Sequence, residues 1–513
     1  MYERRIGRGW SASMRVGPVE EFGTGDAGAL LAQMFGIALG RPASDQHRPM
    51  IDEEAALATL GIDLAVRAAH VATLTNDRGE VVWSRHRFRN RRDELAALIT
   101  RVGELDGLTV VMEPTRNAWV PVAAYFRAAG ATVVLIAPEQ SADLRRYYKK
   151  HTKNDRLDSL MLSRVPLLHP EGLKELSDLG PADALKRAVR RRARLVASRL
   201  AAKQRLDAML DLLGPAYAEV FGTRCTKTTL AVLERYGDPT KLRRLGLGRL
   251  TAFVKRTSHG HWNASQAAEV LAAADDAIEL WADGGLDFAE LAWDLASEIR
   301  TIRSTDTEIA RLEERIAGLY AAADPKQIAA SAPGVGAILA AGIVGRLGDA
   351  NRFDNLAAIR SFSGIVPKVA QSGLAQTQPG ITKQGDPGLR RDIWFAANVA
   401  RTQDPQLAAK YYRLITERKL HHNSAVCHIA TTLITRIAAC LRNGTPYIVR
   451  DTDGREVDRV EAATIIAERY TIPTEARRRA RIPNEMSEPT RKESTRGRSK
   501  PTRSTPNYAL DTA

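Results

Sequence analysis

The stretch Ala58-Thr-Leu-Gly-Ile-Asp-Leu-Ala65 is an apolar run of strand-forming residues that carries one carboxylate, Asp63. A second run, Leu108-Thr-Val-Val-Met-Glu-Pro-Thr115, places Glu113 directly before a proline. A carboxylate at the end of an apolar strand needs a partner, because an unpaired buried charge is costly. The two runs therefore predict strands whose ends carry functional acids.

Two further acids, Asp155 and Asp158, stand three residues apart in Lys153-Asn-Asp-Arg-Leu-Asp-Ser159. On a helix this spacing places both carboxylates on one face. Four converging carboxylates repel one another without a cation, and hard oxygen ligands suit Mg²⁺ or Mn²⁺. We interpret Asp63, Glu113, Asp155 and Asp158 as a metal-dependent phosphoryl-transfer centre. Taken singly, each acid also fits a plainer role as a loop-edge residue, a helix cap or an exposed helix residue.

The elements between these acids follow a readable order. We expect strands at 59–65, 70–75, 81–87, 108–112 and 132–136, and helices at 93–102, at 119–129 and from 138. Three strands in hairpin order, followed by alternating helices and strands, is the ribonuclease-H order. The sequence thus predicts an α/β domain over residues 57–165.

The rest of the chain is predicted to be helical. Long helices over 182–213 and 288–322 show apolar residues at coiled-coil spacing, so residues 180–322 are predicted to be a coiled coil. They are expected to pair antiparallel around a basic helical insert at about 214–285, although pairing between subunits fits the same pattern. No chemistry is assigned to the insert. An all-α domain is expected over 323–447, a poorly ordered extension over 1–56, and a disordered basic tail over 474–513.

Composition narrows the class of partner. Of 513 residues, 75 are Lys or Arg and 60 are Asp or Glu, a net charge of +15 that favours polyanions, nucleic acid above all. The 3 cysteines are widely separated and form neither a disulfide framework nor a zinc pattern, which favours a reducing cytosol. No apolar run reaches the roughly 18 residues of a membrane span.

Candidate nucleic-acid contacts are basic side chains near the acids or in the helical regions, and the glycines of a Gly-x-Gly turn that exposes backbone amides as in helix-hairpin-helix elements. They are Lys149, Lys150, Lys153, Arg156, Arg190, Arg191, Gly334, Gly336, Lys383, Arg390 and Arg391. The competing interpretation is a solvated helix face for the charges and a tight helical turn for the glycines.

The motifs around the four acids resemble the DEDD, RuvC-like domain of the Piv/MooV-type insertion-sequence transposases, the "one-ten" family. The C-terminal half resembles that family's transposase domain through Pro333-Gly-Val-Gly336, Phe362-Ser-Gly-Ile-Val-Pro367, Gln371-Ser-Gly373 and Ile381-Thr-Lys-Gln-Gly385. The resemblance covers roughly 57–445. The N-terminal extension, the basic tail and Gln384, where the family often has a basic residue, depart from the pattern.

The resemblance implies recombination of donor and target DNA, guided by a structured noncoding bridge RNA. It also implies a serine nucleophile, Ser372, that forms a phosphoserine beside the metal-binding acids, and a homo-oligomer (dimer or tetramer) in a prokaryotic cytoplasm, associated with the nucleoid. Ser363, also followed by glycine, is the second choice. The alternatives are a DEDD nuclease or junction resolvase that uses water, and a noncatalytic nucleic-acid-binding protein with a vestigial quartet.

Overall fold

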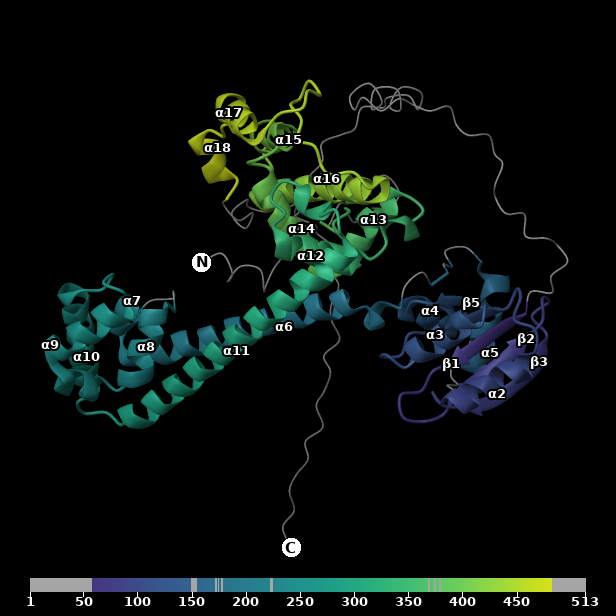
Figure 1. Cartoon of the computed structure of the whole chain (residues 1–513), viewed down its shortest axis with the longest axis horizontal. Coiled ribbons are helices and arrows are strands. Elements are labelled where there is room, and N and C mark those ends of the chain that lie inside the picture. Colours follow the sequence, from purple (N-terminus) through teal and green to yellow (C-terminus); the bar gives the residue numbers. More distant parts are fainter. Residues whose placement is uncertain are drawn as a thin grey trace, which may run out of the picture.

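The structure is a computed structural model that describes residues 58–148, 155–170, 173, 175–176, 179–221, 225–367, 370–372, 375–377 and 380–481. The extension expected at 1–56 and the tail from 482 onward lie outside these residues. Two long helices form a rod, with a helical insert at one end and the sheet domain and the C-terminal helical domain towards the other (Figure 1).

The N-terminal domain is built on a five-stranded sheet. Its strands are β1 Thr59–Asp63, β2 His70–Thr75, β3 Val81–Phe88, β4 Thr109–Met112 and β5 Thr132–Leu135. In space the order is β3-β2-β1-β4-β5, with β1 antiparallel to β2 and parallel to β4. The predicted α/β domain, with hairpin strands before alternating helices and strands, is therefore confirmed.

Helices cover both faces of this sheet. They are α2 Arg92–Val102, α3 Trp119–Ala128, α4 Pro138–Tyr148 and α5 Asp155–Leu168. Side chains alternate between the faces of a strand, so Leu60 and Ile62 are fully buried in the core that α2 and α3 complete. Gly61 points to the other face, against α5.

The rod consists of α6 Ala184–Leu210 and α11 Phe288–Ala323. Arg205 pairs with Glu298 near one end and Arg191 pairs with Glu308 further along, so the two helices run antiparallel within one chain. The predicted antiparallel pairing is confirmed. Four helices form the insert around their own core: α7 Pro215–Phe221, α8 Lys227–Tyr236, α9 Pro239–Thr257 and α10 Ala264–Leu280.

The C-terminal domain packs around α16. Its elements are α12 Ala337–Leu347, α13 Leu356–Ser363, β6 Ala370–Ser372, β7 Ala375–Thr377, α14 Pro387–Ala400, α15 Pro405–Thr416, α16 His422–Asn443, α17 Arg459–Arg469 and α18 Thr474–Arg479. By length and composition α16 is apolar enough to cross a membrane, but here it is the central core helix of this domain.

The domain ends later than the sequence predicted. Helix α18 falls inside the range 474–513 for which composition predicts disorder, and Ala476 and Ala480 are buried in the same core as α16. The expected boundaries at 447 and 474 are therefore wrong for residues up to 481. Small alanines, which carry little hydrophobic signal among arginines, make this contact.

Candidate active site

Helix α5 lies directly on strand β1 because residue 61 has no side chain. A Cβ on Gly61 would lie 2.1 Å from the Ser159 carbonyl oxygen and 2.3 Å from the Ser163 nitrogen, far inside van der Waals contact. Thr73 and Ser159 share a hydrogen bond of 2.8 Å between their hydroxyls, and Thr75 Oγ1 donates to the Ser163 carbonyl at 3.1 Å. The helix is thus fixed in register with β1 and β2.

The first two acids lie at the same edge of the sheet. Asp63 is the last residue of β1, and Glu113 directly follows β4. The strands are parallel neighbours in which Ile62 pairs with Met112, so both carboxylates follow the same strand-end pair. Ser141 Oγ of α4 donates a 2.7 Å hydrogen bond to Glu113 Oε2 and orients this carboxylate.

The direction of α5 brings the other two acids to that edge. Ser163 contacts Thr75 and Ser159 contacts Thr73, so α5 approaches the Asp63 end of β1 as its residue numbers fall. Asp158 precedes Ser159 and is buried at 4% exposure. Asp155 and Arg156 form the first turn of α5, where the structure describes the backbone alone.

The donor set is chemically suited to a hard divalent cation, because it consists of carboxylates at the rim of a sheet buried on both faces. Among the side chains that the structure describes, no group of three or more His, Cys, Asp or Glu lies close enough to hold a metal ion. The Asp155 side chain is not among those described. The backbone positions of the four acids lie towards one edge of the sheet, but the three described carboxylates, those of Asp63, Glu113 and Asp158, do not form a group close enough to hold a metal ion.

The region around Ser372 contains two short antiparallel strands, β6 and β7, in a stretch whose small, polar residues predict a turn-rich loop. Ser372 is the last residue of β6 and pairs with Ala375 of β7. The base of the hairpin is closed by a bridge between Pro367 and Ile381 and by a 2.9 Å hydrogen bond from Thr382 N to the Val366 carbonyl. Ser372 thus lies at the end of a hairpin whose two legs are tied together.

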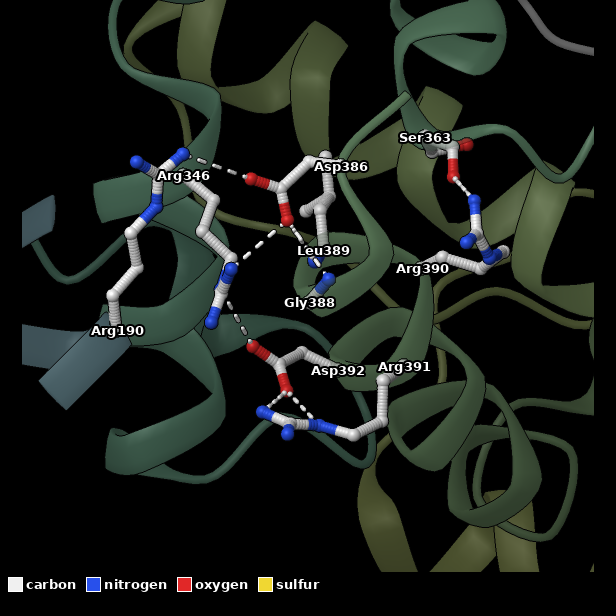
Figure 2. Close-up of polar contacts among 9 residues, drawn as sticks. All are labelled: Arg190, Arg346, Ser363, Asp386, Gly388, Leu389, Arg390, Arg391 and Asp392. Atoms are coloured by element: carbon white, nitrogen blue, oxygen red, sulfur yellow. Dashed lines mark hydrogen bonds and ion pairs between the residues drawn. The ribbon is translucent and has the colours of Figure 1, made fainter. Parts of the chain in front are cut away.

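Arg390 of α14 holds these legs against α13. Its Nη1 donates to the Ser363 carbonyl at 3.2 Å (Figure 2). The same nitrogen donates to the Lys383 carbonyl, also at 3.2 Å. Gly364 ends α13 with φ +68°, and a Cβ there would lie 2.2 Å from the Gln384 carbonyl oxygen, so glycine is required at this crossing. The hairpin base is thus tied to α13 and α14 by hydrogen bonds and close packing.

Asp386 connects the base of this hairpin to helices α12 and α6. Its Oδ1 accepts hydrogen bonds from the Gly388 and Leu389 nitrogens at 2.8 and 2.9 Å and so caps α14. The same carboxylate pairs with Arg346 of α12 at 2.9 Å and with Arg190 of α6 at 3.4 Å (Figure 2). Burial raises the pKa of Asp386, but the bond from Leu389 and the two guanidinium groups outweigh it, so its pKa lies below the ordinary value.

Known proteins match both halves of this chain. A model of the IS110 DEDD domain, described as "Transposase", matches residues 60–215, and one described as "Transposase IS116/IS110/IS902 family" matches 326–413. Both segments are thus similar to IS110-family insertion-element transposases. The first match includes Asp63, Glu113, Asp155 and Asp158, and the second includes β6 and β7, the hairpin that contains Ser372.

Two IS110-family relatives span nearly the whole architecture. A 43.6 kDa protein of insertion element IS110 from Streptomyces coelicolor is 27% identical over 420 residues, which is 80% of this chain and 100% of the relative. A 44.8 kDa protein of insertion element IS116 from Streptomyces clavuligerus is 24% identical over 391 residues, 75% of this chain and 94% of the relative. Transposases are DNA-modifying enzymes, so DNA is the substrate class of the family.

The structure gives internal partners to four of the arginines predicted to contact nucleic acid. Arg190 and Arg390 belong to the Asp386 region described above. Arg191 pairs with Glu308 at 3.0 Å, and Arg391 pairs with Asp392 at 2.8 Å. Arg190, Arg191 and Arg391 are thus paired with carboxylates, whereas Arg390 donates to backbone carbonyls, and their basic sequence context predicts neither arrangement.

The glycine turn and the remaining basic positions differ from one another. The Gly334 N–H donates to Gln403 Oε1 at 2.9 Å, and a Cβ there would lie 2.4 Å from the Ala396 carbonyl oxygen, so Gly334 serves close packing against α14. Gly336 caps α12, with open space around the position of a Cβ, and Lys383 is exposed with φ +56°. Lys149, Lys150 and Lys153 lie outside the described residues.

Sequence reasoning missed Asp386 and Arg346 as functional-site residues. The signal for Asp386 was present, since Asp-Pro at the start of an apolar helical pattern is the signature of an N-cap followed by proline. Arg346 had no such signal, because its partners are 40 and 46 residues further along the chain.

Proposed function

We propose that this chain recombines insertion-element DNA through a covalent phosphoserine on Ser372, assisted by the acids at the sheet edge. The observation that carries the proposal is the coexistence, in one chain similar to IS110-family transposases, of an acid-bearing sheet edge and a braced hairpin that ends at Ser372. The first suits phosphate chemistry, and the second carries a serine, a residue type that can act as a nucleophile once activated.

The geometry favours Ser372 over Ser363 as the nucleophile. Ser363 is fully buried in the last turn of α13, and its Oγ donates a 2.6 Å hydrogen bond to the Arg360 carbonyl. A hydroxyl without solvent access does not reach a DNA phosphate. Ser372 is the last residue of β6, and the resemblance of its Gln-Ser-Gly motif supports it as the nucleophile.

Formation of the phosphoserine needs no external energy source. Ser372 Oγ loses its proton and bonds to the scissile phosphorus, the P–O bond to one deoxyribose breaks, and the released sugar hydroxyl takes up a proton. The phosphoester conserves the bond energy, so a sugar hydroxyl on another strand can reverse the step and join the strands. A divalent cation held by Asp63, Glu113, Asp155 and Asp158 would polarise that phosphate.

The proposal extends to the assembly. We infer a structured noncoding guide RNA that selects donor and target DNA, a dimer or tetramer, Mg²⁺ or Mn²⁺ as the cation, and a cytoplasmic, nucleoid-associated location. The acid edge and Ser372 belong to different domains, joined through α6 and α11 (Figure 1). A complete site therefore either forms between domains of one chain or between subunits.

The experiment that tests the chemistry is a denaturing gel of the full-length protein with the element's flanking noncoding RNA, Mg²⁺ and labelled donor and target DNA. We expect a protein–DNA adduct that disappears in Ser372→Ala and persists in Ser363→Ala. Free cleaved DNA without an adduct would support the alternative, a DEDD nuclease that uses water. DNA binding without cleavage, indifferent to Asp63→Asn, would support the noncatalytic alternative.

An experiment with mixed oligomers distinguishes a site formed within one chain from a site formed between subunits. If the acids of one subunit serve the serine of another, a mixture of Ser372→Ala and Asp63→Ala chains regains adduct formation. If each chain uses its own acids, the mixture stays inactive.

A further inference from the structure

Charge is segregated between two neighbouring helices of the insert. Helix α9 carries six basic residues and no acidic one: Lys241, Arg243, Arg244, Arg249, Lys255 and Arg256. Helix α10, which shares its core, carries four acids and no basic residue. A surface of one sign on so small a domain indicates a charged partner.

The basic side chains of α9 lack the internal partners that the rod provides. On α6, Arg199 and Arg205 are each paired with a carboxylate of α11 at 2.8 and 2.6 Å. On α9, Lys241 is 3.9 Å from Asp238, and the other exposed basic side chains of this helix have no carboxylate within ion-pair distance among the described residues. The positive charge of α9 is therefore available to an external anion.

Two arginines share one aromatic ring at the end of this surface. Arg235 Cζ of α8 lies 5.5 Å from the Tyr236 ring centroid and 5.6 Å from that of Phe253. Arg256 Cζ of α9 lies 5.8 Å from the same Phe253 centroid. Each guanidinium lies over the Phe253 ring within cation–π distance. A planar guanidinium can also donate several N–H groups to a phosphate.

Arg249 has a different role and is not part of this pair. Its guanidinium donates to the Arg244 and Leu245 carbonyls at 3.0 and 2.9 Å, at the kink where Gly246 adopts φ +76°. It holds the bend of α9, so its substitution would report on folding rather than on an anion.

The insert's place at one end of the rod sets the distance between an anion bound there and the other two domains. The 27 residues of α6 span about 40 Å at 1.5 Å per residue, and the insert lies at the far end of the rod from the other two domains (Figure 1). This length is slightly more than one turn of B-DNA, roughly 34–36 Å.

We propose that the surface formed by Arg235, Phe253 and Arg256 binds the phosphodiester backbone of duplex DNA, about one helical turn from the strands being cut. Charge complementarity selects a polyanion, and the choice of DNA rests on the proposed function. Contacts to phosphate carry no sequence information, so the surface adds affinity and orients the DNA while recognition occurs elsewhere.

The test compares full-length variants in their binding to a random-sequence duplex of roughly 40 base pairs over a range of salt concentrations. Arg235→Gln/Arg256→Gln removes both guanidinium groups, and Arg235→Lys/Arg256→Lys keeps the charge but not the planar stacking. The control Arg199→Gln/Arg205→Gln removes the same number of charges from paired positions on the rod. Thermal unfolding of each variant is measured to check that the variant is folded.

We expect the Gln pair to bind about tenfold more weakly and to lower the log–log salt slope by about two, with the Lys pair intermediate and the control near wild type. If a Gln variant does not fold, the Lys pair carries the comparison. Wild-type affinity and slope in both pairs would overturn the proposal, as would weaker binding to a structured RNA of similar length with unchanged duplex binding.

The outcome is separable from that of the proposed function. The adduct depends on Ser372, whereas salt-dependent duplex binding through Arg235 and Arg256 needs no cleavage. An absent adduct in wild type would remove the phosphoserine mechanism and leave the binding result standing.

Discussion

Arg346 and Asp386 form a buried ion pair, with 2.9 Å between Nη1 and Oδ1 and only 6% and 8% of their side chains exposed. Arg346 Nε also lies 3.4 Å from Asp392 Oδ2. The pair links α12 to the cap of α14 and, through Arg190, to α6. It therefore connects the long rod to the base of the serine hairpin.

Removing Arg346 should cost far more than removing an exposed arginine. In Arg346→Met two buried carboxylates lose a partner, and we expect the free energy of unfolding to fall by about 3 kcal/mol, since a broken buried pair costs roughly 3–5 kcal/mol. Asp386 keeps its ion pair with Arg190, so we expect a loss at the low end of this range. Arg191→Gln, which breaks an exposed pair with Glu308, should cost about 1 kcal/mol or less. Urea unfolding measures both, and equal losses would contradict a structural role for the buried pair.

A methyl group at Gly61 should separate α5 from the sheet. In Gly61→Ala the Cβ meets backbone atoms of Ser159 and Ser163, which cannot move without shifting Asp158. We expect about 2–4 kcal/mol of destabilisation and loss of metal-dependent DNA cleavage.

Gly318 provides the matched control for this substitution. It lies in α11 with nothing within 4 Å of the position of a Cβ, so Gly318→Ala should be neutral or stabilise by about 0.5–1 kcal/mol. Comparable losses at the two glycines would show that close packing at Gly61 is not the cause.

The two Ser-Gly serines should respond differently to alanine. Ser363→Ala removes a buried 2.6 Å hydrogen bond to the Arg360 carbonyl and should lower stability by about 1 kcal/mol while the DNA adduct still forms. Ser372→Ala should abolish the adduct and change the unfolding curve little. Mass spectrometry of digested adduct identifies the modified serine, and phosphate on residue 363 would refute the assignment.

Stability should fall in mild acid because the partly buried His428 is kept neutral in the folded protein. Burial, with the Lys410 and Arg418 charges, lowers the pKa of His428 to about 4. The unfolded chain binds the proton near its ordinary pKa of about 6.5, so this contribution is complete above that pH and is lost as the pH falls towards 4. Urea unfolding at about pH 7.5 and about pH 5 should differ less in His428→Gln than in wild type, by about 1–2 kcal/mol. An identical pH dependence would contradict the prediction.

Much of the local structure followed from sequence patterns. The strands around Asp63 and Glu113, the antiparallel rod and most helix limits were predicted, because alternation of period two and apolar spacing of period 3.6 are local signals. The hairpin that ends at Ser372 and helix α18 were missed. Each is short, and each is stabilised by contacts to distant elements rather than by its own composition.

The sequence by itself determined the fold class, the order of the four acids and the segments that carry positive charge, since residue type and spacing encode these directly. Only the tertiary structure decided which basic side chains are left without a carboxylate partner and can bind an external anion. Arg190 and Arg391 are paired with carboxylates, whereas Arg235 and Arg256 lie over an aromatic ring and have no carboxylate partner within the described residues. The reason is that ion pairing depends on distances of a few ångströms between residues far apart in the chain, which no local pattern records.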